Sequence, residues 1–149
     1  MKKEASDTPR HTIVLDWDGT LVPAEWPGQP TEFMPGAIEA CFAMHREGYA
    51  LLVESARLNP YDPWTSLERP AAAVEAEAQY MRATLDSKGL TFVGIWRLHG
   101  KASGSVRVDD KAIRYTGRPG SWRAVTEKVF ALLGAEEPPF PAFNMEVHE

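Results

Sequence analysis

Two aspartates, Asp16 and Asp18, directly follow an apolar run near the start of the chain, and a second acidic pair, Asp109 and Asp110, follows a later one. Clustered carboxylates repel one another unless a cation lies between them. Because their ligand atoms are all oxygen, the expected ion is Mg²⁺, which keeps part of its coordination sphere for water and phosphate oxygens. An aspartate can attack phosphorus, and a second carboxylate can transfer the proton. The acidic residues therefore predict magnesium-dependent phosphoryl chemistry.

Regular elements must position these residues. Apolar β-rich runs predict strands over 11–16, 49–54, 91–98 and 105–110, with a short edge strand over 112–117. Helical spacing and glycine stops predict helices over 35–48, 71–89 and 121–134. Strands that alternate with helices favour a mainly parallel sheet with helices on both faces. Ligands bind at the carboxyl ends of such strands, where the aspartates and Ser55 would lie.

Composition limits the possible classes of protein. The chain has 149 residues, 44% hydrophobic and 25% charged, which is ordinary for a soluble domain with its own core. A net charge of -5 disfavours broad nonspecific binding to nucleic acid. A single cysteine and no long apolar run favour a cytoplasmic protein without a membrane span. We expect a flexible lead over 1–11, a catalytic domain over 12–134, and a proline-rich tail over 135–149 that docks on the domain or a partner subunit.

The motifs together resemble those of the haloacid dehalogenase-like (HAD) phosphatases. DWDGT at 16–20 is similar to their first motif, and LLVESAR, which contains Ser55, is similar to their second. Lys101 resembles the third-motif lysine, although Ala102 follows it where many relatives have proline, and VRVDDKAI resembles the acidic fourth motif. The resemblance covers about residues 12–134. It implies a Rossmannoid three-layer α/β/α fold, and the short spacing between motifs implies the small capless type.

The resemblance also implies roles. Asp16 would be the nucleophile and a Mg²⁺ ligand, and Asp18 the general acid/base, with its backbone carbonyl on the metal. Ser55 would bind the transferring phosphoryl group, Lys101 would neutralise charge, and Asp109 would bind the metal. Asp110 would be a further ligand through water or an orienting neighbour. The assigned substrate-binding residues are Gly19, Thr20, Ala56 and Arg57. Lys88 and Lys111 are the alternative lysines.

Several alternatives stay open. DWDGT alone also fits a strand-closing turn, and Ser55 also fits a helix N-cap. Arg57 would bind a distal anionic group or lie on the surface, and the glutamates after residue 71 would form a solvated helix face. The aromatic residues of the loops, Trp26, Phe33, Tyr61 and Trp64, would stack on a substrate or pack the loops. The expected activity is hydrolysis of a phosphorylated small molecule, with a homodimer possible. Removal of phosphate from polynucleotide ends, or a noncatalytic accessory role, are the other candidates.

Overall fold

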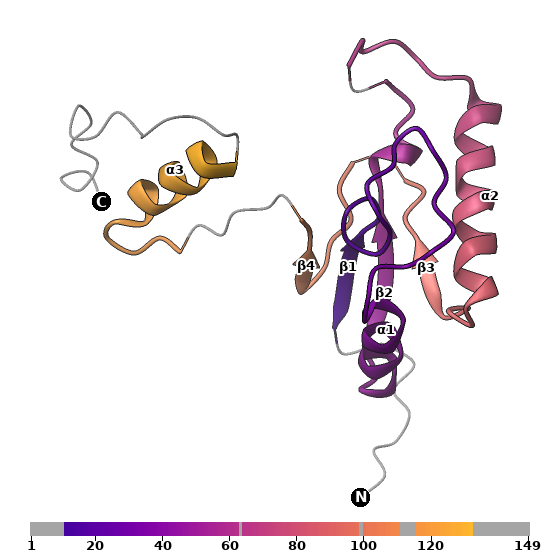
Figure 1. Cartoon of the computed structure of the whole chain (residues 1–149), viewed down its shortest axis with the longest axis horizontal. Coiled ribbons are helices and arrows are strands. Elements are labelled where there is room, and N and C mark those ends of the chain that lie inside the picture. Colours follow the sequence, from indigo (N-terminus) through magenta and orange to yellow (C-terminus); the bar gives the residue numbers. More distant parts are fainter. Residues whose placement is uncertain (1–10, 63, 99, 111–115, 133–149) are drawn as a thin grey trace, which may run out of the picture. The chain divides into compact units, whose positions relative to one another are not determined.

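The computed structural model describes residues 11–62, 64–98, 100–110 and 116–132. The chain divides into two units, Met1–Asp110 and Lys111–Glu149, which are described separately (Figure 1). The single domain expected over 12–134 stays a prediction. The expected tail, nearly all of the expected lead and most of the edge strand expected over 112–117 lie outside the described residues.

Four parallel strands form the sheet of the first unit, in the order β3-β2-β1-β4. They are β1 (Thr12–Asp16), β2 (Ala50–Glu54), β3 (Val93–Ile95) and β4 (Val106–Val108). All four lie within the strands expected from the sequence. Two helices, α1 (Ala37–Arg46) and α2 (Ala71–Ser87), and the short 3₁₀ helix η1 (Ala56–Leu58) lie between β1 and β3. The predicted mainly parallel α/β fold is confirmed, whereas the three-layer arrangement with helices on both faces of the sheet stays a prediction.

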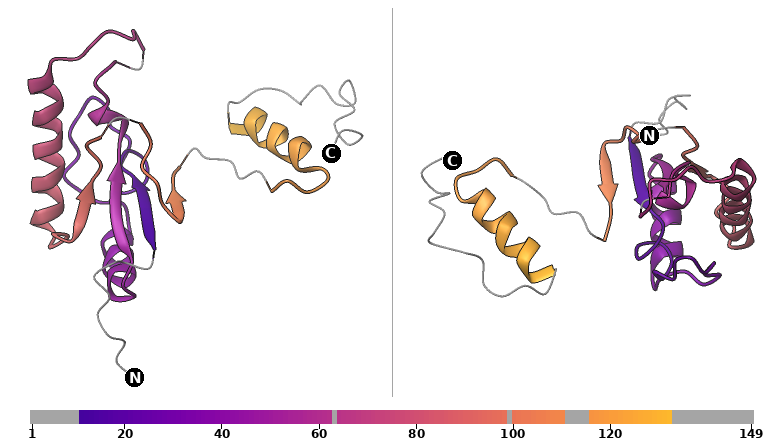
Figure 2. Two further views of the ribbon diagram at one scale, coloured as in Figure 1. Left: turned by 180° about the vertical axis from the view of Figure 1, so that it is seen from behind. Right: turned by 90° about the horizontal axis from the view of Figure 1, so that it is seen from above.

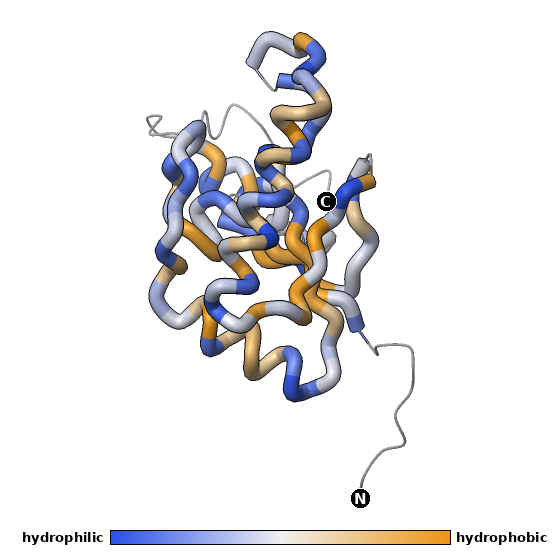
Figure 3. The backbone as a smooth tube through the Cα atoms, turned by 90° about the vertical axis from the view of Figure 1, so that its right-hand side faces the viewer, coloured by the Kyte–Doolittle hydropathy of each residue, from blue (hydrophilic) through white to orange (hydrophobic). Residues whose placement is uncertain are grey.

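One face of the sheet forms the hydrophobic core. Ile13 pairs with Leu51, and Leu51 pairs with Val93, so these side chains lie in one row on the same face. They belong to a buried cluster with Cys41 of α1 and Met81 of α2. Both helices therefore cover this face, and the views from behind and above show them beside the strands (Figure 2). In Figure 3, hydrophobic stretches of the backbone run through the middle of the first unit.

The opposite face places polar residues at the carboxyl ends of the strands. Because side chains alternate along a strand, Asp16 lies on the same face as Val14, opposite the core residues Ile13 and Leu15. Glu54 pairs in register with Asp16, and Asp109 follows β4 at the same level. The segment between β3 and β4 connects the two edge strands of this sheet and contains no helix among its described residues.

The described residues of the first unit contain no separate cap domain. The described connections from β1 to β2 and from β2 to β3 consist of loops with α1 in the first, and η1 and α2 in the second. The second unit contains α3 (Ser121–Leu132), at the position of the predicted last helix. None of the helices in the described part of the chain is both long and apolar enough to cross a membrane.

Candidate metal and phosphate site

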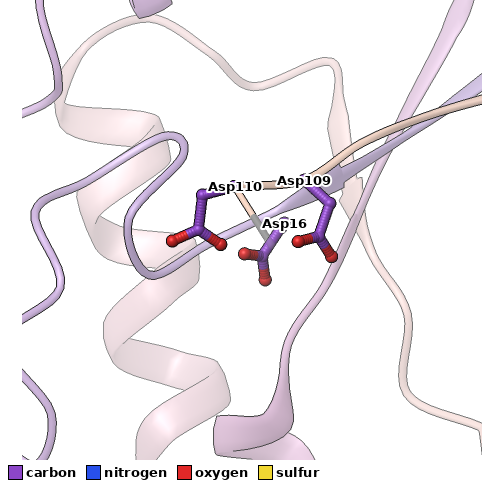
Figure 4. A group of neighbouring side chains, drawn as sticks. All are labelled: Asp16, Asp109 and Asp110. Carbon is purple, nitrogen blue, oxygen red and sulfur yellow. The ribbon is translucent and has the colours of Figure 1, made fainter. Parts of the chain in front are cut away.

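Three carboxylates gather at the carboxyl ends of β1 and β4. One oxygen from each of Asp16, Asp109 and Asp110 lies within 4.8 Å of the others. Asp16 lies between the other two side chains, and all three carboxylates point to the same region (Figure 4). The strand pairing causes this arrangement, because β4 lies directly beside β1. The structure therefore brings together the three side chains predicted for metal binding, whereas Asp18 was expected to contribute its backbone carbonyl.

Electrostatics at Asp16 indicate that a cation fits the cluster. Burial raises the pKa of Asp16 to about 6, and the negative charges of Asp109 and then Asp110 contribute to the rise. A backbone hydrogen bond from Trp17 acts in the opposite direction. A divalent cation would remove the repulsion among these oxygens, and the all-oxygen ligand set suits Mg²⁺.

Gly19 and Thr20 support the cluster from the turn after β1. Gly19 has a φ of +77°, and a Cβ atom at this position would lie 2.2 Å from Oδ2 of Asp110. The Asp110 carboxylate thus occupies space that only glycine leaves open. The Thr20 hydroxyl donates a hydrogen bond to Oδ2 of Asp16 at 3.3 Å. Both residues, assigned to substrate binding from the sequence, contact the acidic residues in this structure.

A pocket of about 440 Å³ opens beside the acidic cluster. Its lining includes Asp16 and Asp109 together with Ser55, Ala56 and Lys101. Ser55 caps η1, where its Oγ accepts a hydrogen bond from the backbone N–H of Arg57 at 3.1 Å. The capping interpretation of Ser55 is therefore confirmed, and its hydroxyl proton can still be donated to a ligand in the pocket. Lys88 lies at the C-cap of α2, and Lys111 is outside the described residues.

Asp18 lies apart from the carboxylate cluster and binds Arg57. Nε and Nη2 of Arg57 donate to the two Asp18 oxygens at 2.8 and 2.7 Å. Nη2 also donates to the Gly28 carbonyl at 2.6 Å, and the guanidinium lies 4.8 Å from the ring centroid of Trp26. Neither Asp18 nor Arg57 is among the residues that line the pocket.

Arg57 departs from one of the two expectations drawn from the sequence. Its side chain is fully buried, so the surface position is wrong. The role in binding a distal anion stays a prediction; in this structure the guanidinium is bound to Asp18 and lies 3.5 Å from Glu77. Burial alone lowers the pKa of Arg57, but the hydrogen bonds and charge of Asp18, with those of Glu77, raise it overall. The guanidinium is therefore a permanently charged partner for Asp18.

Sequence reasoning missed three residues around the site. Glu77 was expected on a solvated helix face, but its side chain faces the buried Arg57. Glu54 and Arg107 line the pocket and form an ion pair at 2.8 Å. The one available signal was that Glu54 ends β2 directly before Ser55. Nothing in the local sequence indicated its partner.

Two of the loop aromatics have packing partners. Trp26 lies over Arg57, and Phe33 forms an edge-to-face contact with Trp17 at a centroid distance of 6.0 Å. Trp64 is 85% exposed. Of these loop aromatics, Trp26 and Phe33 therefore contribute to loop packing.

Comparisons with known proteins give little further information. No family model and no curated protein matches the chain. A solved structure, that of a conserved protein from Bacteroides thetaiotaomicron, is 21% identical and matches with a TM-score of 0.46. The match covers 82% of this chain and 91% of that one.

Proposed function

We propose that the protein is a Mg²⁺-dependent phosphatase of the HAD type that hydrolyses a phosphate monoester through an aspartyl-phosphate intermediate. The observation that carries this proposal is the cluster of Asp16, Asp109 and Asp110 beside a pocket that also contains Ser55 and Lys101. Carboxylates for a hard cation, a hydroxyl and an ammonium group together match the charge of a phosphoryl group.

The three clustered carboxylates would hold Mg²⁺, with the backbone carbonyl of Asp18 as a further ligand. When bound, the ion would neutralise charge on the phosphoryl oxygens and on the acidic residues. Asp16 is the best-placed nucleophile, because it is the central carboxylate and the Thr20 hydroxyl orients it. Ser55 and Lys101 would bind phosphoryl oxygens from the pocket side.

The reaction takes two steps. An Asp16 oxygen forms a bond to phosphorus while the bond to the ester oxygen breaks, and the leaving oxygen takes a proton from Asp18 or from water. A water molecule then attacks phosphorus and gives a proton to Asp18. The acyl phosphate bond breaks, which releases inorganic phosphate and restores the Asp16 carboxylate.

The Asp18–Arg57 pair affects these two steps differently. Arg57 donates to both carboxylate oxygens, so Asp18 is a hydrogen-bond acceptor at both of them. Each oxygen keeps a lone pair that can accept the proton of the attacking water in the second step, whereas donation of a proton to the leaving group requires Asp18 to leave Arg57. Esters with good leaving groups need no such protonation. They should therefore depend less on Asp18 in the first step than alkyl esters do.

The decisive experiment measures hydrolysis of p-nitrophenyl phosphate by the full chain, with Mg²⁺ and with EDTA. Activity should require Mg²⁺, and Asp16→Asn should lower kcat by at least about 1,000-fold because the nucleophile is lost. Asp86→Asn is a matched control, since Asp86 forms an exposed ion pair with Arg82 on α2. Persistence of full activity in Asp16→Asn would refute the nucleophile assignment.

A direct test of the intermediate uses labelled substrate and an acid quench. Asp18→Asn should retain label on the protein longer than the wild type, and hydroxylamine should release it as expected for an acyl phosphate. The substrate panel should include nucleotides, sugar phosphates and oligonucleotides with terminal phosphate. Selective cleavage of the oligonucleotides would indicate polynucleotide-end processing. Mg²⁺ binding without turnover on any substrate would instead indicate an accessory protein.

A further inference from the structure

The backbone on both sides of Lys101 is tied down by hydrogen bonds. On one side, the indole N–H of Trp96 donates to the carbonyl of Gly100 at 2.9 Å. On the other, the backbone N–H of Ala102 donates to Oε2 of Glu54 at 2.7 Å. Ala102 is also buried, at 4% exposure, whereas Lys101 is exposed and lines the pocket. The chain is thus anchored next to a side chain that extends into the pocket.

Arg107 completes this anchor from the far side of β1. Its Nη1 donates to the Ala102 carbonyl and its Nη2 to Oε1 of Glu54, both at 2.8 Å. Arg107 belongs to β4 and Glu54 to β2, the two strands that flank β1. The arginine therefore spans β1 and binds both the Lys101 loop and the glutamate that holds it. We refer to Glu54 and Arg107 as the Lys101 clamp.

The clamp also explains why a fourth carboxylate beside Asp16 is not in the metal cluster. Glu54 is the register partner of Asp16, but the cluster contains only Asp16, Asp109 and Asp110. Both Glu54 oxygens accept hydrogen bonds, and Arg107 balances the charge. A carboxylate with both oxygens occupied in this way is available for positioning rather than for a cation.

We propose that Glu54 and Arg107 are positioning residues that hold the Lys101 loop so that the lysine ammonium meets the phosphoryl group in the pocket. The inference rests on the proposed function, since it assigns a purpose to Lys101. On this proposal, loss of the clamp lowers turnover because Lys101 is no longer held in position. A merely structural ion pair would instead change stability without this dependence.

A double-mutant cycle on kcat/KM tests that dependence. Lys101→Ala and Glu54→Ala should each lower kcat/KM for p-nitrophenyl phosphate by about tenfold or more, mainly through kcat. The double variant should be about as active as Lys101→Ala alone, because the clamp has no lysine left to position. Arg107→Ala should show the same dependence with a smaller loss. If the double variant loses kcat/KM by the product of the two single-variant factors, the two residues act independently and the proposal is overturned.

Asp86→Ala is the control, because it removes another ion pair of the first unit, neither residue of which lines the pocket. It should leave kcat/KM within about twofold of the wild type, alone and combined with Lys101→Ala. Loss of activity in this control comparable to that in Glu54→Ala would show that a general loss of stability explains both, and would also overturn the proposal.

Hydrogen exchange at the Ala102 amide gives a readout that does not require activity. Exchange should accelerate about tenfold or more in Glu54→Ala, while the amides of β1 and β2 remain protected, because only the loop is released. Unchanged Ala102 exchange would contradict the clamp. If the wild type hydrolyses no phosphate ester, the proposed function fails. The anchoring part of the inference is then judged by Ala102 exchange alone.

Discussion

Asp16 is partly buried and lies among like charges, and both conditions determine how the metal-free protein responds to pH. Its pKa rises in the folded state from 3.8 to about 6, so folding favours the protonated form. The stability that this proton provides is present at low pH and is lost as the pH rises through about 6. At pH 8, the unprotonated Asp16 therefore opposes folding when no metal is bound.

Asp16→Asn should consequently raise the free energy of unfolding at pH 8 in EDTA, and the gain should shrink towards pH 4. Urea unfolding at pH 4, 6 and 8 measures it. Asp86→Asn should give no gain at pH 8, because that carboxylate pairs with Arg82. Equal stabilities of wild type and Asp16→Asn at pH 8 would contradict the expected repulsion.

Gly19 offers a second test at the residue scale. Gly19→Ala should destabilise the fold by about 1 kcal/mol or more, since φ is positive and the new Cβ would displace Asp110. It should also weaken Mg²⁺ binding, measured by titration calorimetry. Gly48→Ala is the matched control: Gly48 has a φ of +88° but no atom within 4 Å of the new Cβ. Gly48→Ala should destabilise the fold and leave the affinity for Mg²⁺ unchanged. Equal Mg²⁺ affinities of the two variants would contradict displacement of Asp110 by the new Cβ.

Much of the candidate site could be predicted at this scale, because Asp16 ends one strand, Ser55 and Asp109 directly follow two others, and parallel strands end at one edge. The partners of the charged side chains could not be predicted from the sequence. Arg57 and Asp18 are separated by 39 residues, and Arg107 and Glu54 by 53. Such pairs depend on tertiary packing, to which local composition gives no guide.

At the scale of elements, Arg57 connects η1 to α2 and to the loop after β1. It binds Asp18 and the Gly28 carbonyl, and it faces Glu77 of α2. Arg57→Met should lower the free energy of unfolding by about 3–5 kcal/mol, because two partly buried carboxylates lose their counterion. Urea denaturation measures this loss.

Arg97→Met provides the comparison, because it also removes an arginine that pairs with a glutamate of α2. Arg97 pairs with Glu75 of α2, and both side chains are about half exposed. Arg97→Met should lower the free energy of unfolding by less than about 1 kcal/mol. Similar losses in the two variants would mean that the buried network does not hold these elements together.

The helices and strands themselves were predictable from periodicity, whereas the 3₁₀ helix η1 is too short to leave a periodic signal.

For the whole molecule, the metal cluster links the first strand to the last strand of the first unit. β4 has three residues and lies at an edge of the sheet, where β1 is its only strand partner among the described residues. A cation shared by Asp16, Asp109 and Asp110 would hold these strands together. Mg²⁺ should therefore raise Tm, by an amount equivalent to about 2.7 kcal/mol at 100 times Kd.

Calorimetry with Mg²⁺ and with NaCl of equal ionic strength measures this linkage. The Mg²⁺-dependent rise should largely disappear in Asp109→Asn, and amide exchange in β4 should slow only in the protein that binds the ion. An equal rise with NaCl would indicate general screening and would contradict a specific site.

The position of β4 at the end of the first unit also has a consequence for biosynthesis. Asp16 leaves the ribosome long before Asp109 and Asp110, and β1, α1 and β2 have all been made once residue 54 has emerged. The strand that carries Asp16 is therefore complete while only one of the three clustered carboxylates has been made. On the proposed function, reactivity towards phosphate esters would begin only with the addition of β4, so it would be the last property that the first unit acquires.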